Sequence, residues 1–275
     1  MTAGLLCLRS LMDSAGARFS LAIHEDGSLD ADDIARLESE IPRARVVTKA
    51  SVEPMLAEKL KNYPACREAR KRNVMFLKMF DIALSEAQTP QNHLRYIDSD
   101  ILFFRRLDGF FDSPTPAIFG QERGVVLCSP HLKLWRLARR PMLKGVNGGV
   151  FFLDLKLLDL DRIEWAIENI FLPGPKHPHM IDQSLYAILY ATPQTRLISQ
   201  NNVQLATELH LEHPDFAAIH FVGKDKNNAL NYAEKSREML QMPPLKAKFS
   251  VPQTHTLPTI LRDMVKNQTR RLLKK

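Results

Sequence analysis

The sequence is poor in cysteine, and the three cysteines that it has are widely separated. Cys7, Cys66 and Cys128 form no CxxC pair and no cysteine–histidine cluster. A disulfide framework needs an even set of cysteines, and a structural zinc site needs paired thiolates or imidazoles at short spacing. The sequence therefore predicts neither kind of site, and it fits a protein of the reducing cytoplasm.

Long apolar runs are also absent. The longest uncharged apolar stretches lie around residues 146–153 and 185–189, whereas a membrane-spanning helix needs about 20 such residues. The start of the chain, residues 1–12, has no early positive charge and is interrupted by Arg9, which is not typical of a secretory signal. We therefore predict neither a transmembrane helix nor export.

Positive charge is concentrated at one end of the chain. The sequence has 38 Lys and Arg against 31 Asp and Glu, a net charge of +7, and residues 262–275 hold six basic side chains and one acidic one. That segment contributes +5 (6 − 1), which leaves +2 for the remainder. A body with so little charge is not typical of a protein that wraps nucleic acid, so we predict no nucleic-acid partner.

The order of the expected elements predicts an α/β fold. Residues 19–24 alternate as a strand, Asp30 is a candidate N-cap for a helix that reaches Ile41, and a second strand follows at 44–48. Further helices are expected at 52–61, 65–87, 162–170 and 181–190, and further strands at 94–97, 101–104, 117–120, 125–128, 150–153 and 216–221. Such an order favours a parallel α/β sheet over an all-helical chain.

Two aspartates stand two residues apart between apolar runs. An apolar strand that ends in Asp98 and Asp100 delivers carboxylate oxygens to the sheet edge where α/β proteins usually bind ligands. Such a pair can hold Mn²⁺ or Mg²⁺ against a diphosphate. Two acids in a solvated turn are the plainer interpretation, but apolar flanks make an unpaired double carboxylate costly. Phosphatases of the haloacid-dehalogenase type also carry an Asp-x-Asp motif after an apolar strand. That family expects Thr or Val two residues after the second Asp, where this sequence has Leu102.

A histidine leaves a later apolar strand just before a glycine and two lysines. His220 is followed by Gly223, Lys224 and Lys226. Imidazole is a good ligand for Mn²⁺, glycine lets the backbone approach a phosphate, and lysine neutralises phosphate charge. A single histidine after a strand is more often structural than a ligand. Together with the two aspartates, however, His220 would complete a metal site with three ligands.

Four segments in this order resemble the retaining glycosyltransferases of family 8, which have the GT-A fold. They are the DxD segment at 96–102, Val-Asn-Gly-Gly-Val-Phe-Phe-Leu-Asp-Leu at 146–155, Ile-Asp-Gln-Ser-Leu at 181–185, and His-Phe-Val-Gly-Lys-Asp-Lys at 220–226. The ordered set is much more specific than any single member. The resemblance implies an α/β fold with a Rossmann-like, mixed and mostly parallel sheet flanked by helices. It also implies a GT-A-like transferase domain over residues 1–228 and a C-terminal helical extension with a basic tail over 229–275.

The resemblance also implies a metal site and a diphosphate site. Asp98, Asp100 and His220 match the family's ligands of Mn²⁺ (or Mg²⁺). For the donor diphosphate, the matching positions are Ser99 within the DxD motif, Gly223, Lys226, and Lys78 on the helix before the DxD strand.

Two further elements match those that surround the donor sugar. Asn147 and Gly148 match an Asn-Ala/Ser-Gly element, in which a glycine here replaces the commoner small residue. Asp182 matches a carboxylate that accepts bonds from sugar hydroxyls, and Gln183 an amide near the anomeric carbon that stabilises the transition state. The plainer alternatives are a tight strand entry at Asn147 and a helix N-cap at Asp182.

The implied reaction is transfer of a hexose from a nucleotide-diphosphate sugar, with UDP as the expected nucleotide, to an acceptor hydroxyl with retention. The acceptor would be a glycan or a lipid-linked molecule. Family members begin with a strand that grips the nucleotide base and then a helix, whereas residues 2–11 already resemble that helix. The first strand is therefore expected to be absent, which favours the alternative of a non-catalytic sugar-nucleotide or glycan-binding relative.

Two basic segments are expected to be helical. Residues 259–275 place apolar side chains near one face, typical of a helix that lies on anionic lipid, and would make the protein a peripheral protein of the inner membrane face. A terminal helix docked on the body is an equal alternative. Residues 131–144 carry five basic side chains, Trp135 and no acid, and would either contact an anionic or lipid-linked acceptor or form a solvated helix.

Overall fold

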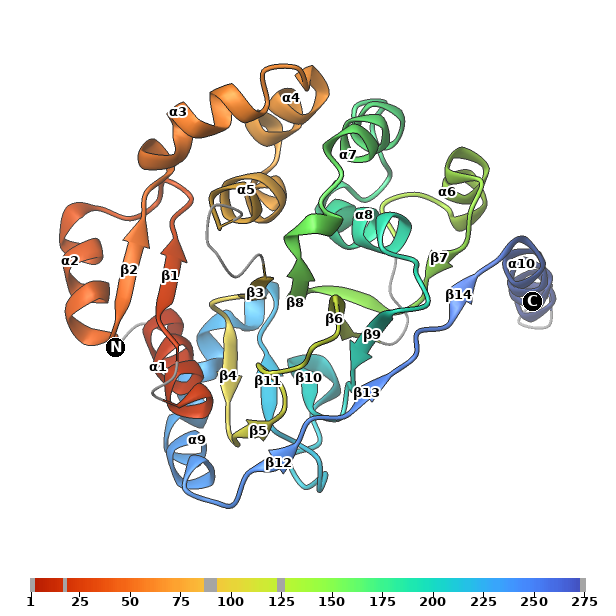
Figure 1. Cartoon of the computed structure of the whole chain (residues 1–275). Coiled ribbons are helices and arrows are strands. Elements are labelled where there is room, and N and C mark those ends of the chain that lie inside the picture. Colours follow the sequence, from red (N-terminus) through yellow and green to blue (C-terminus); the bar gives the residue numbers. More distant parts are fainter. Residues whose placement is uncertain (1–2, 17–18, 87–92, 123–126, 273–275) are drawn as a thin grey trace.

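A computed structural model describes residues 3–16, 19–86, 93–122 and 127–272, with the side chains of 208, 223–226 and 267–272 left out. Figure 1 shows helices on both sides of a group of short sheets. The described chain begins with helix α1 (Ala3–Ala15), and then continues as a strand–helix–strand unit of β1 (Leu21–His24), α2 (Ala31–Glu40) and β2 (Ala44–Val47).

That unit confirms the expected crossover. Strands β1 and β2 are parallel, with Leu21 opposite Ala44. Asp30 caps α2, because its carboxylate accepts a hydrogen bond of 2.8 Å from the backbone N–H of Asp33. Among the described strands, β1 pairs only with β2.

The central sheet has five strands. Their spatial order is β13 (Phe249–Ser250), β9 (Thr195–Ile198), β6 (Ala117–Gln121), β8 (Val146–Asp154) and β3 (His93–Ile97). Side chains alternate between the faces of a strand, so Phe151 and Leu153 of β8 join one core while Val150 and Phe152 join another. Both faces of β8 are covered, which explains why its sequence is apolar almost throughout.

A second sheet lies beside the first and supplies one wall of the site described below. It consists of β10 (Val203–Leu205), β11 (Ala218–His220) and β4 (Ile101–Phe103), with β11 parallel to β10 and antiparallel to β4. In this register His220 stands opposite Ile101, the residue that directly follows the DxD motif. The pairing therefore brings two motifs together that are more than a hundred residues apart in the sequence.

Helices cover one face of the central sheet (Figure 1). They are α3 (Lys49–Lys59), α4 (Pro64–Arg72), η1 (Val74–Leu77), η2 (Lys78–Ile82), α5 (Ala83–Glu86), α6 (His131–Ala138), α7 (Leu160–Ala166), η4 (Ile167–Phe171) and α8 (Ile181–Leu189). The short 3-10 turns η3 (Leu155–Leu157), η5 (Pro178–Met180) and η6 (Ala206–Glu208) connect other elements.

The prediction of a single helix over residues 65–87 is wrong, because the helix is broken at Asn73. The backbone of Asn73 is extended, and its side chain accepts a hydrogen bond from Met75 N and donates one to Pro178 O. The local bond to Met75 competes with the helical ladder, and the bond to the distant Pro178 supports the break at Asn73. The chain then resumes as the 3-10 turn η1 and the π-helical turn η2, which begins at Lys78.

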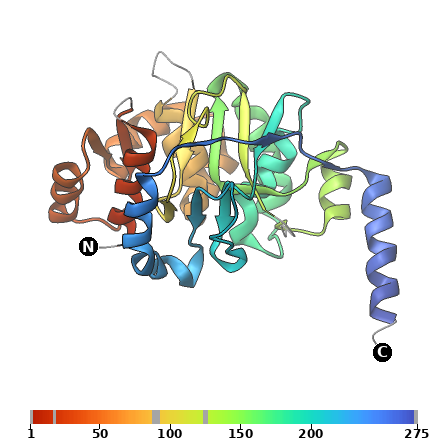
Figure 2. The same ribbon diagram turned by 90° about the horizontal axis from the view of Figure 1, so that it is seen from below.

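The C-terminal part returns across the body. Elements η7 (Gly223–Tyr232) and α9 (Ala233–Leu240) pack against α1, and an extended strap then pairs β12 (Leu245–Lys246) with β5 (Leu107–Asp108) and β14 (Thr254–His255) with β7 (Met142–Leu143). The expected basic helix is confirmed as α10 (Leu257–Leu272), which Figure 2 shows standing off the side of the body. The division of the chain at residue 228 stays a prediction.

Other expectations differ in detail. The α/β class with a mixed sheet is confirmed, but parallel pairing does not predominate: four of the nine described pairings are parallel and five antiparallel, because β8 runs antiparallel to both neighbours. The strand expected at 216–221 is shortened to β11, and that at 125–128 falls largely outside the described residues. In the part of the chain that the structure covers, no helix is long and apolar enough to cross a bilayer.

Candidate metal centre

The turn that carries the two aspartates is held from both sides. Strand β3 ends at Ile97 and β4 begins at Ile101, so Asp98 and Asp100 lie in the connection between the two sheets. The backbone N–H of Asp98 donates to Gly149 O of β8 at 2.8 Å, and Asp100 O accepts from the N–H of Phe221 at 2.9 Å. Because each neighbouring sheet fixes one end of the turn, the two carboxylates are placed before any ligand binds.

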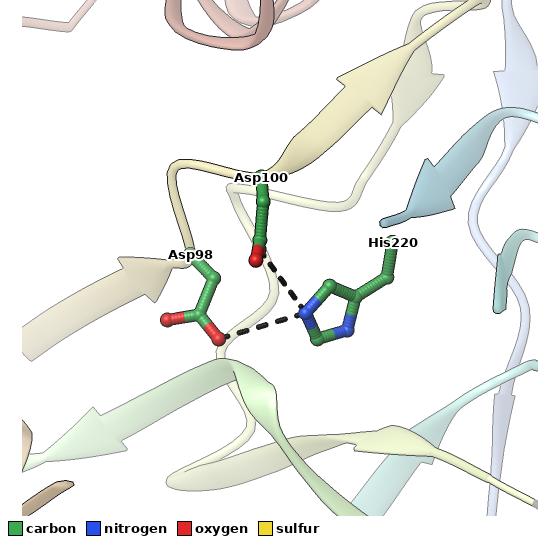
Figure 3. A group of neighbouring side chains, drawn as sticks. All are labelled: Asp98, Asp100 and His220. Carbon is green, nitrogen blue, oxygen red and sulfur yellow. Dashed lines mark ion pairs between the residues drawn. The ribbon is translucent and has the colours of Figure 1, made fainter. Parts of the chain in front are cut away.

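Asp98, Asp100 and His220 converge on one point (Figure 3). The Nε2 atom of His220 lies 3.2 Å from Asp100 Oδ1 and 3.6 Å from Asp98 Oδ2. One donor atom from each residue lies within 4.8 Å of the others. His220 itself is buried at the end of β11.

This donor set fits a divalent cation. Carboxylate oxygens suit Mg²⁺ and Mn²⁺, and an imidazole nitrogen suits a transition metal, so the mixture favours Mn²⁺. The group can therefore hold a metal ion, and the identity of that ion is part of the proposal below.

Two adjacent glycines of β8 make room for the site. A Cβ atom on Gly149 would stand 2.3 Å from Cε1 of His220, and a Cβ atom on Gly148 would stand 2.6 Å from Oδ2 of Asp182. Real Cβ atoms essentially never approach that closely. The Gly-Gly pair thus leaves room for side chains that arrive from β11 and α8.

Lys78 reaches the centre from the π-helical turn η2. Its ammonium donates hydrogen bonds to Asp98 Oδ2 at 3.0 Å and Gly148 O at 3.2 Å, and lies 3.5 Å from Asp182 Oδ2. Burial by itself would lower the pKa of Lys78, but the two carboxylates outweigh it and raise the pKa above its usual value. Lys78 is therefore a buried cation beside the three candidate ligands, and the carboxylates of Asp98 and Asp182 stabilise its charged form.

Tyr96 was not foreseen as a site residue. It lies near the end of β3, two positions before Asp98, and the Tyr96 hydroxyl donates a hydrogen bond to Asp98 Oδ1. Burial, followed by the charge of Asp98, raises the pKa of Tyr96 well above its usual value. Both oxygens of Asp98 are thus engaged, one by the phenol and one by Lys78, and this fixes the orientation of the carboxylate.

Asp182 and Gln183 open helix α8, but they face different partners. Asp182 is 6% exposed, and burial raises its pKa even though Lys78 acts in the opposite direction. The Gln183 side-chain amide donates to Met180 Sδ at 3.1 Å. Consecutive residues of a helix point in different directions, so the structure brings Asp182 to the centre and directs Gln183 onto the preceding turn. The N-cap alternative for Asp182 is not met, because it lies inside the first turn.

Asn147 connects the centre to a second residue that the sequence did not reveal. Its Oδ1 accepts from the N–H of Gly149, and its Nδ2 donates to Glu122 Oε2, both at 2.8 Å. Glu122 follows the end of β6, and no local pattern could have identified it because the bond spans 25 residues. Glu122 lines a cleft of 610 Å³ together with Gln121, Gln200, Asn201, Gln204, Leu205, Thr207, His210 and His213.

The remaining expected site residues are Ser99, Gly223 and Lys226. Ser99 is exposed at the tip of the turn between the aspartates. Gly223 and Lys226 lie at the start of η7, three and six residues after His220, and their side chains are outside the described part of the structure.

Comparison with known proteins supports the fold. No family model matches the sequence, and no curated protein matches it. Among solved structures, an active-site mutant of LgtC aligns over 88% of this chain and 94% of its own, with a TM-score of 0.52 and 14% identity. Galactosyltransferase LgtC in complex with donor and acceptor sugar analogs gives a TM-score of 0.48 at 14% identity over the same shares of the two chains. Mouse xyloside xylosyltransferase 1, apo form, gives 0.47 at 16% identity, over 82% of this chain and 92% of its own. At such identities the likeness shows the fold alone: the chain has the GT-A fold.

Proposed function

We propose that this protein is a metal-dependent glycosyltransferase of the family 8 type. It would move a hexose from a nucleotide-diphosphate sugar, with UDP as the nucleotide, to the hydroxyl of a glycan or lipid-linked acceptor with retention of configuration. The observation that carries this proposal is the convergence of Asp98, Asp100 and His220 beside the buried Lys78 in a GT-A fold. A divalent cation held by these carboxylates beside Lys78 would suit a diphosphate leaving group.

The three candidate ligands would hold the Mn²⁺ or Mg²⁺ ion. When bound, such an ion would supply positive charge that offsets the charge developing on the departing nucleoside diphosphate. Lys78 adds a fixed positive charge to the same region, since it is buried and its charged form is stabilised. Gly223 and Lys226 follow His220 closely enough in sequence to meet the same diphosphate, with glycine allowing close backbone approach.

The sugar would lie on the side of the centre formed by Asn147, Gly148 and Asp182. Asp182 is held by Lys78 with its carboxylate against Gly148, and it would accept hydrogen bonds from sugar hydroxyls. Gln183 would turn from Met180 towards the anomeric carbon. Retention by front-face attack of the acceptor hydroxyl needs no separate carboxylate nucleophile.

The proposal is tested by calorimetric titration of UDP into the whole protein with and without Mn²⁺. We expect metal-dependent binding in the wild type and its loss in Asp100→Asn and His220→Ala. Asp32→Asn is a matched control, because Asp32 is an exposed carboxylate on α2. UDP binding that does not depend on Mn²⁺, or that is unchanged in Asp100→Asn, would contradict the proposal.

Consumption of UDP-sugars then separates an enzyme from a binding protein. Metal-dependent release of UDP from one of a panel of UDP-hexoses would support transfer. Metal-dependent UDP binding without any release, even with acceptor sugars present, would favour the non-catalytic sugar-nucleotide-binding relative. Release of phosphate from simple phosphate esters would instead identify the haloacid-dehalogenase-type alternative.

A further inference from the structure

One carboxylate oxygen of Asp98 lies close to both His220 and Lys78. The other oxygen, Oδ1, accepts a hydrogen bond from the Tyr96 hydroxyl. Oδ2 lies 3.6 Å from Nε2 of His220 (Figure 3) and 3.0 Å from Nζ of Lys78. The oxygen that lies towards the other candidate metal ligands is therefore the one that the lysine ammonium binds. A metal ion and the ammonium would thus meet at the same atom.

The ammonium of Lys78 lies between two carboxylates. Asp98 is on one side, and Oδ2 of Asp182 is 3.5 Å away on another. Gly148 O accepts a further hydrogen bond from the ammonium at 3.2 Å. The side chains of Lys78 and Asp182 are 13% and 8% exposed, so water and salt screen these charges weakly. Lys78 can therefore give up Asp98 and stay paired, because Asp182 and Gly148 bind the ammonium from other directions.

This arrangement makes Lys78 a competitor of a metal ion. A divalent cation on Oδ2 of Asp98 would have to share that oxygen with the ammonium or displace it. Sharing brings two positive charges to one atom, and their repulsion is strong where screening is weak. Displacement breaks a charge-assisted hydrogen bond. In either case the lysine lowers the affinity of the three ligands for a metal ion that arrives alone.

A nucleoside diphosphate would change this balance. Its phosphate oxygens carry negative charge and accept hydrogen bonds, so they can bind the ammonium and a metal ion together. Both cations are then attracted to the same anion, which offsets the repulsion between them. Binding of the diphosphate would therefore strengthen metal binding, and by linkage the metal would strengthen nucleotide binding by the same factor.

We propose that Lys78 is the counter-ion of Asp98 in the free protein and competes with the metal for this carboxylate until a nucleoside diphosphate binds. The inference rests on the metal centre of the proposed function and adds a coupling between its two ligands. A lysine that only oriented Asp98 would act in the opposite direction, because its loss would let the carboxylate turn and would weaken metal binding. The sign of the change in metal affinity therefore separates the two roles.

The test is calorimetric titration of Mn²⁺ into the whole protein, alone and saturated with UDP. Lys78→Met removes the charge and keeps an unbranched side chain, whereas Lys78→Gln also keeps a hydrogen-bond donor, so the test does not depend on the folding of one variant. Without UDP, both variants should bind Mn²⁺ more tightly than the wild type, by about 5- to 150-fold, the usual size of a coupling between two sites. UDP should then strengthen Mn²⁺ binding by a smaller factor than in the wild type.

Lys59→Met is the matched control. Lys59 is a partly buried lysine of α3 whose ammonium donates to a backbone carbonyl, Leu84 O, at 2.8 Å rather than to a carboxylate. The substitution removes the same charge and should leave Mn²⁺ binding unchanged. All titrations are made above neutral pH, so that the carboxylates stay ionised when their lysine partner is removed. Circular dichroism checks that each variant is folded.

The possible results separate this inference from the proposed function. An Mn²⁺ affinity that is unchanged or weaker in the folded Lys78 variants would overturn the inference, while metal-dependent UDP binding by the wild type would leave the proposed function standing. Tighter Mn²⁺ binding by these variants, without UDP binding by any of the proteins, would refute sugar transfer and uphold the competition at Asp98. Absence of Mn²⁺ binding by every protein, with and without UDP, would overturn both.

Discussion

The contact between Gly149 and His220 provides the sharpest test of the candidate metal centre. In Gly149→Ala the new Cβ would stand 2.3 Å from Cε1 and 2.8 Å from Nδ1 of His220, and 3.0 Å from Oδ1 of Asn147. Gly149 cannot easily move away, because its N–H donates to Asn147 and its carbonyl accepts from Asp98 N. His220 is buried, so its ring must shift against packed neighbours.

The expected cost follows from these distances. Overpacking a filled site typically costs about 1–3 kcal/mol of stability, and we expect Gly149→Ala to lie in the upper half of that range. A displaced imidazole should also weaken Mn²⁺ binding by about 10- to 100-fold, the effect usually seen when a metal ligand loses its orientation. Gly4→Ala is the matched control, because its nearest neighbour, Ser99 O on the DxD turn, is 3.9 Å from the new Cβ.

A double-mutant cycle distinguishes the clash from general damage. His220→Ala removes the ring that the new methyl group would meet, so the double variant with Gly149→Ala should be more stable than the sum of the single effects by about 1–2 kcal/mol. Chemical denaturation of the four proteins measures this coupling, and calorimetric titration of Mn²⁺ measures the ligand effect. A folded Gly149→Ala protein with wild-type Mn²⁺ affinity would refute the assignment of His220 as a ligand. Additive stability changes would refute the contact itself.

For two other perturbations, the structure predicts the direction of the change in stability. Arg70 donates two hydrogen bonds of 2.7 Å to Asp81, and the two side chains are 10% and 6% exposed. Arg70→Met leaves the buried Asp81 carboxylate without its partner, so it should lower the free energy of unfolding by about 3–5 kcal/mol, measured by urea denaturation. The half-exposed partner Glu53 serves as control, since Glu53→Gln should cost under about 1 kcal/mol. Burial, followed by the charge of His131, lowers the pKa of His255 to about 4. The unfolded chain then binds more protons, so stability present above pH 6.5 should fall by about 1–2 kcal/mol as the pH drops towards 4, after allowing for partial exposure. His255→Gln should flatten that part of the profile, and an unchanged slope would assign it to other groups.

Local sequence patterns identified much of the fold. The alternation at β1, the Asp30 cap of α2 and the apolar run of β8 each reflect forces that act within a few residues, and the structure confirms all three. The break at Asn73 was missed, because the bond to Pro178 O that supports it comes from a loop more than a hundred residues away. The even balance of parallel and antiparallel pairing was also missed, since strand spacing does not encode strand direction.

In the candidate site, too, the sequence identified side chains by their chemistry, whereas the fold decided how close together they lie. Asp98, Asp100 and His220 could be proposed from the chemistry of their side chains and the apolar strands before them. Their separation of 3.2–3.6 Å, however, depends on the pairing of β11 with β4. Their roles as ligands stay a prediction for the titrations described above.

The sequence by itself determined which residues are able to bind a cation or a diphosphate, because that ability resides in single side chains and short motifs. Only the tertiary structure decided the companions of these residues. It engaged Asp98 with Tyr96 and Lys78, linked Asn147 to Glu122, and required glycine at Gly149 because a ring from another sheet fills the space of its side chain. It also placed α6 beside α10, although more than a hundred residues separate them in the sequence. Such contacts arise from packing between distant segments, and no local pattern records them.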